Sequence, residues 1–476
     1  MRPERKRYLI IAGGIVLLIV IAATVTILIF DINSYKSQME NAASEATGLD
    51  VSIKGRMGLS FFPLGISAKD IHVANKESEI LSLESLKLRT ELIPLLKKQL
   101  KVTACELVKP AVTIVKDAEG KYNFETNKKI STIGPGIASG LNELKLSKGV
   151  LVHLNKRTGK KTELKEFNMA TRDLSMAGTS DGIIKNVSFT GSFDCKELLQ
   201  KDLRIENLKG PLKADKGVFS FKPLTMDIFG GKGEGDFTAD ESGADPVYTV
   251  NLSVSKLDFE KLEKFFGTSK LIGGKGDLSA SLTVKEKEGR NLMSSLDGTF
   301  SLRGDNLVTY TVDLDKFLSA YKTTRQFHLV DIAAYFVAGP LGSAALTGYR
   351  YGNLYYETQG GRGAITQFIS RWTIKKGEAD ATDCALATHH HRVALKGKLN
   401  LVRERYENVT VAILDDKGCA TITQTISGPF SSPQSGAANP IDSLTAPIFD
   451  LYRKVERFVK DGKCDAFYNG SVQQPR

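Results

Sequence analysis

The sequence predicts a mainly β protein, in which an N-terminal transmembrane helix precedes a long, curved antiparallel β-sheet with short α-helices. Two observations carry this fold class. Residues 8–30 form a long apolar segment without a charged residue, and most of the chain from Val51 to about Leu401 alternates between apolar and polar residues. Alternation with period two is typical of strands, and glycine-rich turns such as FGGKGEGD and IGGKGD separate the alternating runs.

The apolar segment YLIIAGGIVLLIVIAATVTILIF (residues 8–30) is long enough for a membrane-spanning helix, which needs about 20 residues. It is longer than the apolar part of a secretory signal, so we interpret it as an uncleaved anchor. The basic residues 1–7, MRPERKR, predict a cytoplasmic tail. The chain from about Asp31 onward is then expected on the other side of the membrane.

The amino-acid composition argues against nucleic-acid binding. The 476 residues carry a net charge of +11, from 65 basic and 54 acidic residues. We find no cluster of Arg and Lys interleaved with aromatic residues, so nucleic acid is not an expected partner. The moderate positive charge indicates an ordinary soluble surface, with weak attraction to anionic lipid headgroups as the alternative.

The helices expected in the body of the chain are short. Residues 32–46 have a helical pattern that continues from the anchor, and residues 319–338 hold one or two helices. DFEKLEKFF (residues 258–266) reads as a short amphipathic helix with Asp258 as its N-cap. A period of 3.6 predicts another helix between Thr445 and Gly462, after a polar linker.

The alternating runs share one apolar face, which has to be covered. It can close on itself, pack against helices, or curl into a trough that binds acyl chains, because a large exposed apolar area normally marks a binding surface. A closed β core without a ligand is the alternative. The residues chosen as candidates for lining a lipid groove are Leu88, Val250, Leu252, Leu278, Leu282 and Phe300.

The stretch GLSFFPLGISAKDIHVAN (residues 58–75) contains a change of phase. Ile66 and Ala68 share a face, but the next apolar pair, Ile71 and Val73, is displaced by one residue. Such a slip turns the later side chains over unless a bulge absorbs it, so we expect a bend there. Phe61 and Phe62 are predicted either to lie at the level of the lipid headgroups or to pack against the first helix.

Few residues are candidates for metal binding or catalysis. His389 and His391 could share a face of a strand and bind a metal, but no third ligand is evident, and an exposed strand edge is the favoured interpretation. Asp415 and Asp416 in LDDKGC are typical of a hairpin turn. No catalytic or phosphate-binding motif is present. We therefore expect no enzyme activity, no cofactor and no bound metal.

Three parts of the sequence resemble the AsmA family of bacterial envelope proteins. They are DINSYKSQMENAASEATGLDVSIKGRMGLSFFPLGISAKDIHVAN after the anchor, PAVTIVKDAEGKYNFE, and LKGKLNLVRERYENVTVAILDDKGCATITQTISGPFSSPQ near the end. CDAFYNGSVQQP is similar to a terminal strand of such proteins. The resemblance implies a chorein-like start and a β-taco trough. The expected regions are 31–131 (chorein-like), 141–428 (trough, with a helical insertion near 315–345) and 440–476 (helix and closing strand).

The same resemblance implies a single-pass inner-membrane protein with a cytoplasmic N-terminus and a periplasmic body. Its expected role is to bind or transport phospholipid through the apolar groove and so to support lipid homeostasis of the outer membrane. The alternative is a periplasmic scaffold for the assembly of outer-membrane proteins. The expected partners are phospholipid, the inner membrane and outer-membrane assembly partners.

The chain has five cysteines in a compartment that permits disulfides. Cys419 and Cys464 both lie in the part that resembles the closing sheet of the family, and we predict that they form a disulfide that holds the last helix as a lid over the trough. Pairing of Cys384 with Cys419, or five free thiols, are the alternatives. An odd number leaves at least one cysteine without a partner in the chain.

Overall fold

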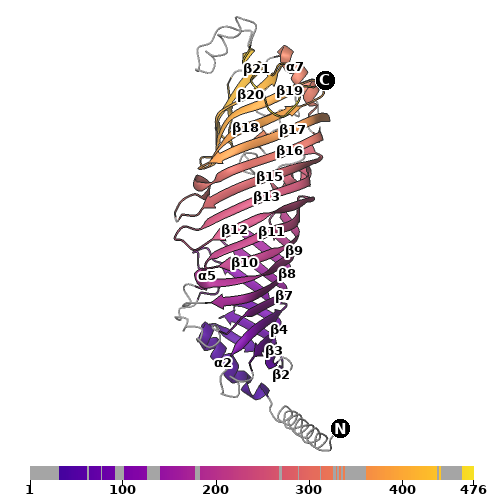
Figure 1. The fold of residues 1–476 in the computed structure, drawn as a ribbon. Helices are drawn as coiled ribbons and strands as arrows, with labels where there is room; N and C mark the ends of the chain where they lie inside the picture. Colours follow the sequence, from indigo (N-terminus) through magenta and orange to yellow (C-terminus); the bar gives the residue numbers. More distant parts are fainter. Residues whose placement is uncertain are drawn as a thin grey trace, which may run out of the picture. The chain divides into compact units, whose positions relative to one another are not determined.

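A computed structural model describes residues 32–475 except 62–63, 77, 92–100, 126–139, 177–182, 267–270, 288, 311, 325–328, 330–331, 334–335, 338–360, 437–438 and 441–463. The chain forms two compact units, residues 1–196 and 197–476. Both units are built mainly from β-strands with few short helices, as the alternation predicts (Figure 1). The boundary between the two units falls inside the strand Val187–Gln200.

The first unit starts with two helical segments and continues with strands. Its elements are η1 (Ile32–Tyr35), α2 (Lys36–Thr47), β1 (Asp50–Ile53), β2 (Met57–Phe61), β3 (Leu64–Asn75), β4 (Ser78–Thr90), β5 (Val102–Val108), β6 (Ala111–Lys116), β7 (Glu143–Asn155), β8 (Lys160–Met176), α5 (Ile183–Asn186) and most of β9 (Val187–Gln200). The helical pattern of residues 32–46 is therefore confirmed.

The strands of the first unit are not all antiparallel, which corrects the prediction. β3 and β4 are antiparallel, but β5 and β6 both run parallel to β7. Parallel neighbours need a crossover of about a dozen residues or more, and the chain between Lys116 and Glu143 has that length. Period-two alternation alone does not distinguish the two arrangements.

The change of phase in residues 58–75 is present as a distortion of β3. Asp70 adopts a left-handed conformation with φ of 54°. Ala68 and Ile71, on either side of it, are both buried in one cluster with Leu83 of β4. The distortion therefore keeps the apolar residues on one face. Phe62 lies outside the described residues, and only the backbone of Phe61, at the end of β2, is described.

Helix α2 covers the outer edge formed by β1 and β2. Oε1 of Glu40 accepts a hydrogen bond from the backbone N–H of Ile53 at 2.6 Å, and Oγ of Ser44 accepts one from Val51 at 2.9 Å. Oδ1 of Asn33 in η1 accepts a hydrogen bond from the N–H of Met57 at 2.8 Å. These side chains occupy backbone groups through which an edge strand could pair with another chain.

The second unit holds the longer run of strands. Its elements are β10 (Leu203–Asp215), β11 (Val218–Ile228), β12 (Gly231–Asp240), β13 (Val247–Asp258), α6 (Phe259–Phe265), β14 (Ile272–Gly273), β15 (Lys275–Lys285), η3 (Leu292–Ser295), β16 (Asp297–Thr309), α7 (Leu314–Thr324), β17 (Gly363–Lys375), β18 (Glu378–Ala387), β19 (Arg392–Asn400), β20 (Arg405–Leu414), β21 (Ala420–Pro429), β22 (Gln434–Ser435) and β23 (Asn439–Pro440).

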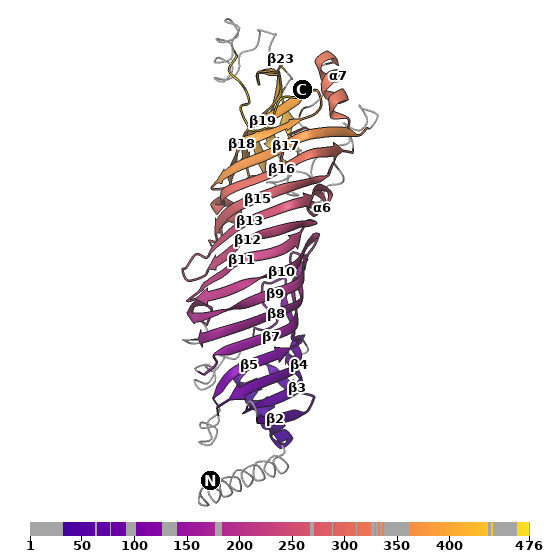
Figure 2. The same cartoon turned by 45° about the vertical axis from the view of Figure 1, so that its right-hand side comes forward.

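The strands of the second unit form an antiparallel meander. β10 to β13 pair in chain order, β13 pairs with β15, and β15 to β21 continue in order (Figures 1 and 2). The short β22 and β23 pair with the outer side of β21. Because β13 and β16 are both antiparallel to β15, both strands end on the side of the sheet where β15 begins. Helices α6 and α7 follow these two strand ends and lie on that side (Figure 2).

Two local predictions in this unit are confirmed. Oδ1 of Asp258 accepts a hydrogen bond from the N–H of Glu260 at 3.0 Å and so caps α6. Asp415 and Asp416 lie in the turn between β20 and β21, where Oδ1 of Asp415 accepts a hydrogen bond from the N–H of Cys419 at 2.8 Å. The expected helix near residues 319–338 begins earlier, at Leu314.

The predicted anchor, residues 8–30, lies outside the described residues, as does the predicted helix between Thr445 and Gly462. Among the residues that the structure describes, no helix combines the length and the apolar character needed to cross a membrane.

Candidate functional site

The apolar face of the second unit is the candidate functional site. Val250 of β13 is the register partner of Leu282 of β15, and Leu252 is the partner of Ala280, which in turn pairs with Phe300 of β16. Register partners project from the same face of a sheet. The structure therefore brings these four predicted residues together in two adjacent rows.

Leu278, the fifth predicted residue, belongs to the next row and pairs with Val254 and Leu302. Leu88, the sixth, lies on β4 of the first unit, where its partners are Ile66 and Cys105. It is half-buried and belongs to the separate apolar face of that unit. The predicted set thus divides between the two units.

Burial along β13 shows how far this face is covered. Val254 and Leu257, near the end of the strand, are fully buried, whereas Val250 and Leu252 are half-buried. Leu282, opposite Val250, is also half-buried. The middle of this face on β13 and β15 therefore remains partly accessible to solvent.

The rows continue onto β11 and β12. Val250 pairs with Phe237, which pairs with Phe221, and the centroids of the two rings lie 6.1 Å apart. Leu252 instead faces Gly235. A Cβ atom added to Gly235 would lie 2.0 Å from the carbonyl oxygen of Asn251, so even alanine does not fit there. The row is consequently without a side chain at this position, beside the half-buried Leu252.

The same face is fully covered further along the sheet. Phe300 pairs with Trp372 of β17, which is completely buried. Phe368 of the same strand stacks on Phe336, with ring centroids 5.8 Å apart, and meets Phe259 of α6 edge-on at 6.1 Å. Residues from the helical insertion and from α6 therefore cover the apolar face of β16 to β21.

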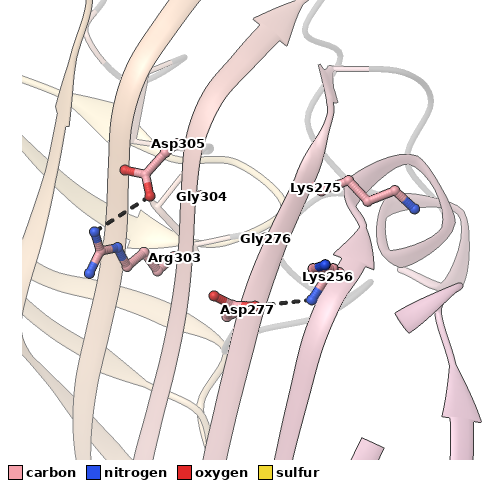
Figure 3. Close-up of a pocket in the computed structure, with 7 residues that line it drawn as sticks. All are labelled: Lys256, Lys275, Gly276, Asp277, Arg303, Gly304 and Asp305. Carbon is pink, nitrogen blue, oxygen red and sulfur yellow. Dashed lines mark hydrogen bonds and ion pairs between the residues drawn. The ribbon is translucent and has the colours of Figure 1, made fainter. Parts of the chain in front are cut away.

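A charged hollow of about 150 Å³ lies at the end of β13, the start of β15 and the middle of β16 (Figure 3). Its lining residues are Lys256, Lys275, Gly276, Asp277, Arg303, Gly304 and Asp305. The acidic groups are engaged within the protein: Oδ1 of Asp277 accepts a hydrogen bond from the backbone N–H of Lys256 at 3.0 Å, and Asp305 pairs with Arg303 at 3.4 Å. Figure 3 shows the basic side chains pointing in different directions, so they do not converge on one ligand.

A second hollow, of about 410 Å³, lies over β12, β13, β15 and β16. Its lining residues include the polar Glu234, Ser253, Ser279 and Thr299, and also Leu252 and Ala280. Oγ of Ser281 donates a hydrogen bond to Oδ1 of Asn251 at 2.7 Å on the same surface. These polar residues contrast with the apolar rows formed by the alternate residues of the same strands.

The histidine cluster differs from the prediction of an exposed strand edge. The three residues form the turn between β18 and β19, and His391 is buried. Its Nδ1 lies 3.2 Å from Oδ1 of Asp315 at the start of α7. The backbone N–H groups of His389 and His390 donate hydrogen bonds to the same carboxylate, as does the hydroxyl of Thr388.

The turn therefore binds a carboxylate of the chain itself. Burial acts to raise the pKa of Asp315, but hydrogen bonds from Thr388 and His391 and from the backbone outweigh it and hold the pKa below its ordinary value. In the part of the chain that the structure describes, no group of three His, Cys, Asp or Glu residues could hold a metal ion.

Glu263 of α6 is the most strongly perturbed acid on this side of the sheet. Its two oxygens accept hydrogen bonds from the backbone N–H groups of Leu271 and Ile272 at 3.0 and 2.9 Å. Burial raises its pKa to about 7, although these two hydrogen bonds act in the opposite direction. The carboxyl group joins α6 to the start of β14.

The structure joins Cys419 and Cys464 by a disulfide, with Cα atoms 6.1 Å apart, and leaves Cys105, Cys195 and Cys384 as thiols. The residues that follow, 464–475, do not form the expected closing strand. They pack through Tyr468 and Val472 against a cluster that includes Ile369, Ala385 and Ala394. These residues alternate with Phe368, Cys384 and Leu395 of the apolar face, so the tail lies on the opposite face. The last helix, which is the predicted lid, lies outside the described residues.

Sequence analysis missed the contacts that fix this tail. The hydroxyl of Tyr468 donates a hydrogen bond to Asp383, and Oγ of Ser471 donates one to the same carboxylate at 2.8 Å. Arg392 donates a hydrogen bond to the carbonyl of Val472 at 3.2 Å. The one signal in the sequence is Asp383, which directly follows Thr382 and so breaks the alternation of polar and apolar residues in β18.

The comparisons with known proteins agree with the resemblance found in the sequence. The model of the AsmA family matches residues 1–132 and 141–339. No curated protein and no solved structure matches the chain.

Proposed function

Because the chain belongs to the AsmA family, which suggests a function in the bacterial envelope, we propose that it binds or transports phospholipid through the apolar face of its second unit. The acyl chains contact the half-buried side chains of β11 to β15, and the protein supports the lipid homeostasis of the outer membrane. The observation that supports this proposal is the pair of apolar rows through Val250 and Leu252, which remain partly accessible while the adjoining face is covered.

Substitution of this face tests the proposal. Aspartate at both Leu252 and Leu282 places charges where acyl chains would lie, and burying an unpaired carboxylate in apolar surroundings is strongly unfavourable. We expect phospholipid that co-purifies with the detergent-extracted protein, measured by mass spectrometry, to fall about tenfold or more.

The matched control adds the same two charges to the other face of the same strands. Ser253 and Ser279 are exposed register partners, and aspartate at both positions should leave the lipid content unchanged. Unchanged lipid in a folded Leu252→Asp/Leu282→Asp protein would overturn the proposal for this face. Loss of lipid in both double variants would also contradict it.

We further propose an inner-membrane location, with residues 8–30 as a single anchor, a cytoplasmic N-terminus and a periplasmic body. The basic residues before the apolar segment support this orientation. A reporter that is active only in the cytoplasm, fused after Arg476, should be silent. An active reporter would contradict the orientation.

The observed sheet edges favour lipid binding over the alternative of a scaffold for outer-membrane proteins. A scaffold that recognises unfolded β-proteins by strand addition needs an accessible edge. Side chains of η1 and α2 occupy backbone groups of β1 and β2, and β22 and β23 pair with β21.

A further inference from the structure

The residues that cover the apolar face of β17 to β21 form a distinct element, which we call the plug. It consists of α7 and the described residues Leu329, Ile332, Ala333, Phe336 and Val337. Leu314, Phe317 and Leu318 of α7 are fully or almost fully buried, and so are the other five residues. The plug therefore places its apolar side chains on the surface that continues the candidate lipid-binding rows.

The register identifies that surface as the same face. Leu278 pairs with Leu302, Leu302 with Ser370, and Ser370 with Cys384. The row continues through Leu395 and Val411 to Gln424. The row begins beside the half-accessible part of the face and ends beneath the plug.

The two polar residues of this row bind the plug. Oγ of Ser370 donates a hydrogen bond to the carbonyl of Phe336 at 2.6 Å, and Oε1 of Gln424 accepts one from the N–H of Leu329 at 2.5 Å. Both side chains are buried. Two hydrogen bonds to its backbone therefore fix the plug on this otherwise apolar row.

The sheet does not need the plug for its own hydrogen bonding. The excursion that contains the plug leaves β16 at Thr309 and returns to β17 at Gly363, and these two residues are direct register partners. β16 and β17 pair from there to Gly298 and Ile374 at the other end. The plug can consequently move without breaking any pair of strands.

One charged contact holds the plug at the rim of the sheet. The carboxylate of Asp315 accepts the hydrogen bonds of the Thr388–His391 turn that are described above. The turn joins β18 to β19. Asp315 is the second residue of α7, which begins at Leu314. This contact links the start of α7 to the sheet.

We propose that the plug is a displaceable, intramolecular occupant of the lipid-binding face, and that the contact of Asp315 with the Thr388–His391 turn is its latch. The inference rests on the proposed function. With the latch closed, lipid is confined to the face of β11 to β15. When the latch opens, the apolar rows of β17 to β21 become available to the same ligand.

Cys384 offers a native probe of this opening. Its thiol is 1% exposed, lies in the row beneath the plug, and is not in a disulfide. Cys195, equally buried in the first unit, reports general loosening of the protein. In full-length protein, Asp315→Ala should accelerate labelling of Cys384 by N-ethylmaleimide about tenfold, because it removes charge-assisted hydrogen bonds, and should leave Cys195 unaffected.

Lys316→Ala is the matched control, since it truncates the neighbouring charged side chain, which is 85% exposed. It should leave both labelling rates unchanged. Labelling of Cys384 at the wild-type rate in Asp315→Ala would overturn the latch. Equal acceleration at Cys195 would also overturn it, because it would indicate general loosening in place of local opening.

A second variant tests whether lipid binds to the surface that the plug covers. Because Thr309 and Gly363 are register partners, an Asn-Gly turn can join them in place of residues 310–362. The folded variant should carry about twice the phospholipid of the wild type if lipid follows apolar area. If the wild-type protein carries phospholipid and the folded deletion variant carries no more phospholipid than the wild type, this inference is wrong, but the proposed function is not contradicted. Absence of lipid from both proteins would overturn the proposed function as well.

Discussion

The hydroxyl of Tyr468 lies 2.5 Å from Oδ1 of Asp383, although 85 residues separate them in the chain. The same hydroxyl accepts a hydrogen bond from the N–H of Val472 at 3.0 Å, and both partners are buried. One hydroxyl group therefore satisfies two buried polar groups and fixes the tail to β18.

Replacing Tyr468 with Phe should destabilise the second unit by about 1–3 kcal/mol, because the carboxylate of Asp383 and the N–H of Val472 each lose a partner. Urea unfolding followed by circular dichroism measures this change. Tyr122→Phe is the control, since that half-buried residue contacts Phe124 and Lys116 through its ring. An equal effect of the two substitutions would contradict the role of the Tyr468 hydroxyl.

The disulfide between Cys419 and Cys464 closes a long loop, with a sequence separation of 45. The chain-entropy treatment gives a stabilisation of about 4 kcal/mol for a loop of this length. Cys464→Ser should therefore lower the thermal midpoint of the second unit and make residues 464–475 accessible to protease. Cys105→Ser, at a half-buried thiol of the first unit, serves as the control. Recovery of Cys464 as an alkylated thiol from unreduced wild-type protein would contradict the pairing.

The latch at Asp315 should weaken in acid. Its pKa is lowered in the folded protein, so its contribution to stability is complete above the ordinary aspartate pKa of about 3.9 and is lost as the pH falls through the lower folded value. The difference in unfolding free energy between wild type and Asp315→Ala should therefore shrink as the pH falls below about 4. A difference that stays unchanged down to about pH 3 would contradict the lowered pKa of this carboxylate.

Glu263 should produce the opposite dependence. Its folded pKa of about 7 lies above the ordinary value of 4.5, so the folded state retains a proton that the unfolded state has released. Between these two values the unfolding free energy falls as the pH rises, and above about 7 the effect is constant. Urea unfolding at pH 5 and pH 8 should show a larger decrease for wild type than for Glu263→Gln. Equal decreases would contradict the raised pKa.

Removal of Glu40 should expose the edge of β1 in the first unit. Its carboxylate accepts the N–H of the buried Ile53, and Glu40→Ala leaves that group unpaired at a cost of about 1–3 kcal/mol. Light scattering should detect self-association through the freed strand. Glu45→Ala, at an exposed position of the same helix, should remain like the wild type. Self-association of both variants would contradict a specific role of Glu40 in covering this strand edge.

Much of the fold was predictable because alternation reports which strand face is buried. Val250, Leu252, Leu278, Leu282 and Phe300 were chosen on this basis, and they do share a face. Alternation does not report what covers the face. The half-buried Leu252 and the fully buried Val254 look alike in the sequence, and the difference arises where α6 packs against the end of β13.

Contacts between distant polar residues were harder to predict. Asp315 and the histidine turn are separated by more than 70 residues, and nothing in either stretch of sequence indicates that the two are in contact. The tail on the opposite face was also missed, because its contacts come from side chains and a disulfide without strand pairing that alternation could indicate.

The distortion at Asp70 has a consequence for how this sheet can vary in evolution. Three positions separate Ala68 from Ile71 on β3, and the same spacing separates their partners Leu86 and Leu83 on β4. Both strands therefore carry the slip at the same level, and register is preserved across it. Loss of one residue from β3 alone would turn Ile71 away from the core, while β4 would keep its side chains in place. Changes of length at this level are tolerated only when neighbouring strands change together, so insertions and deletions should occur here as matched pairs.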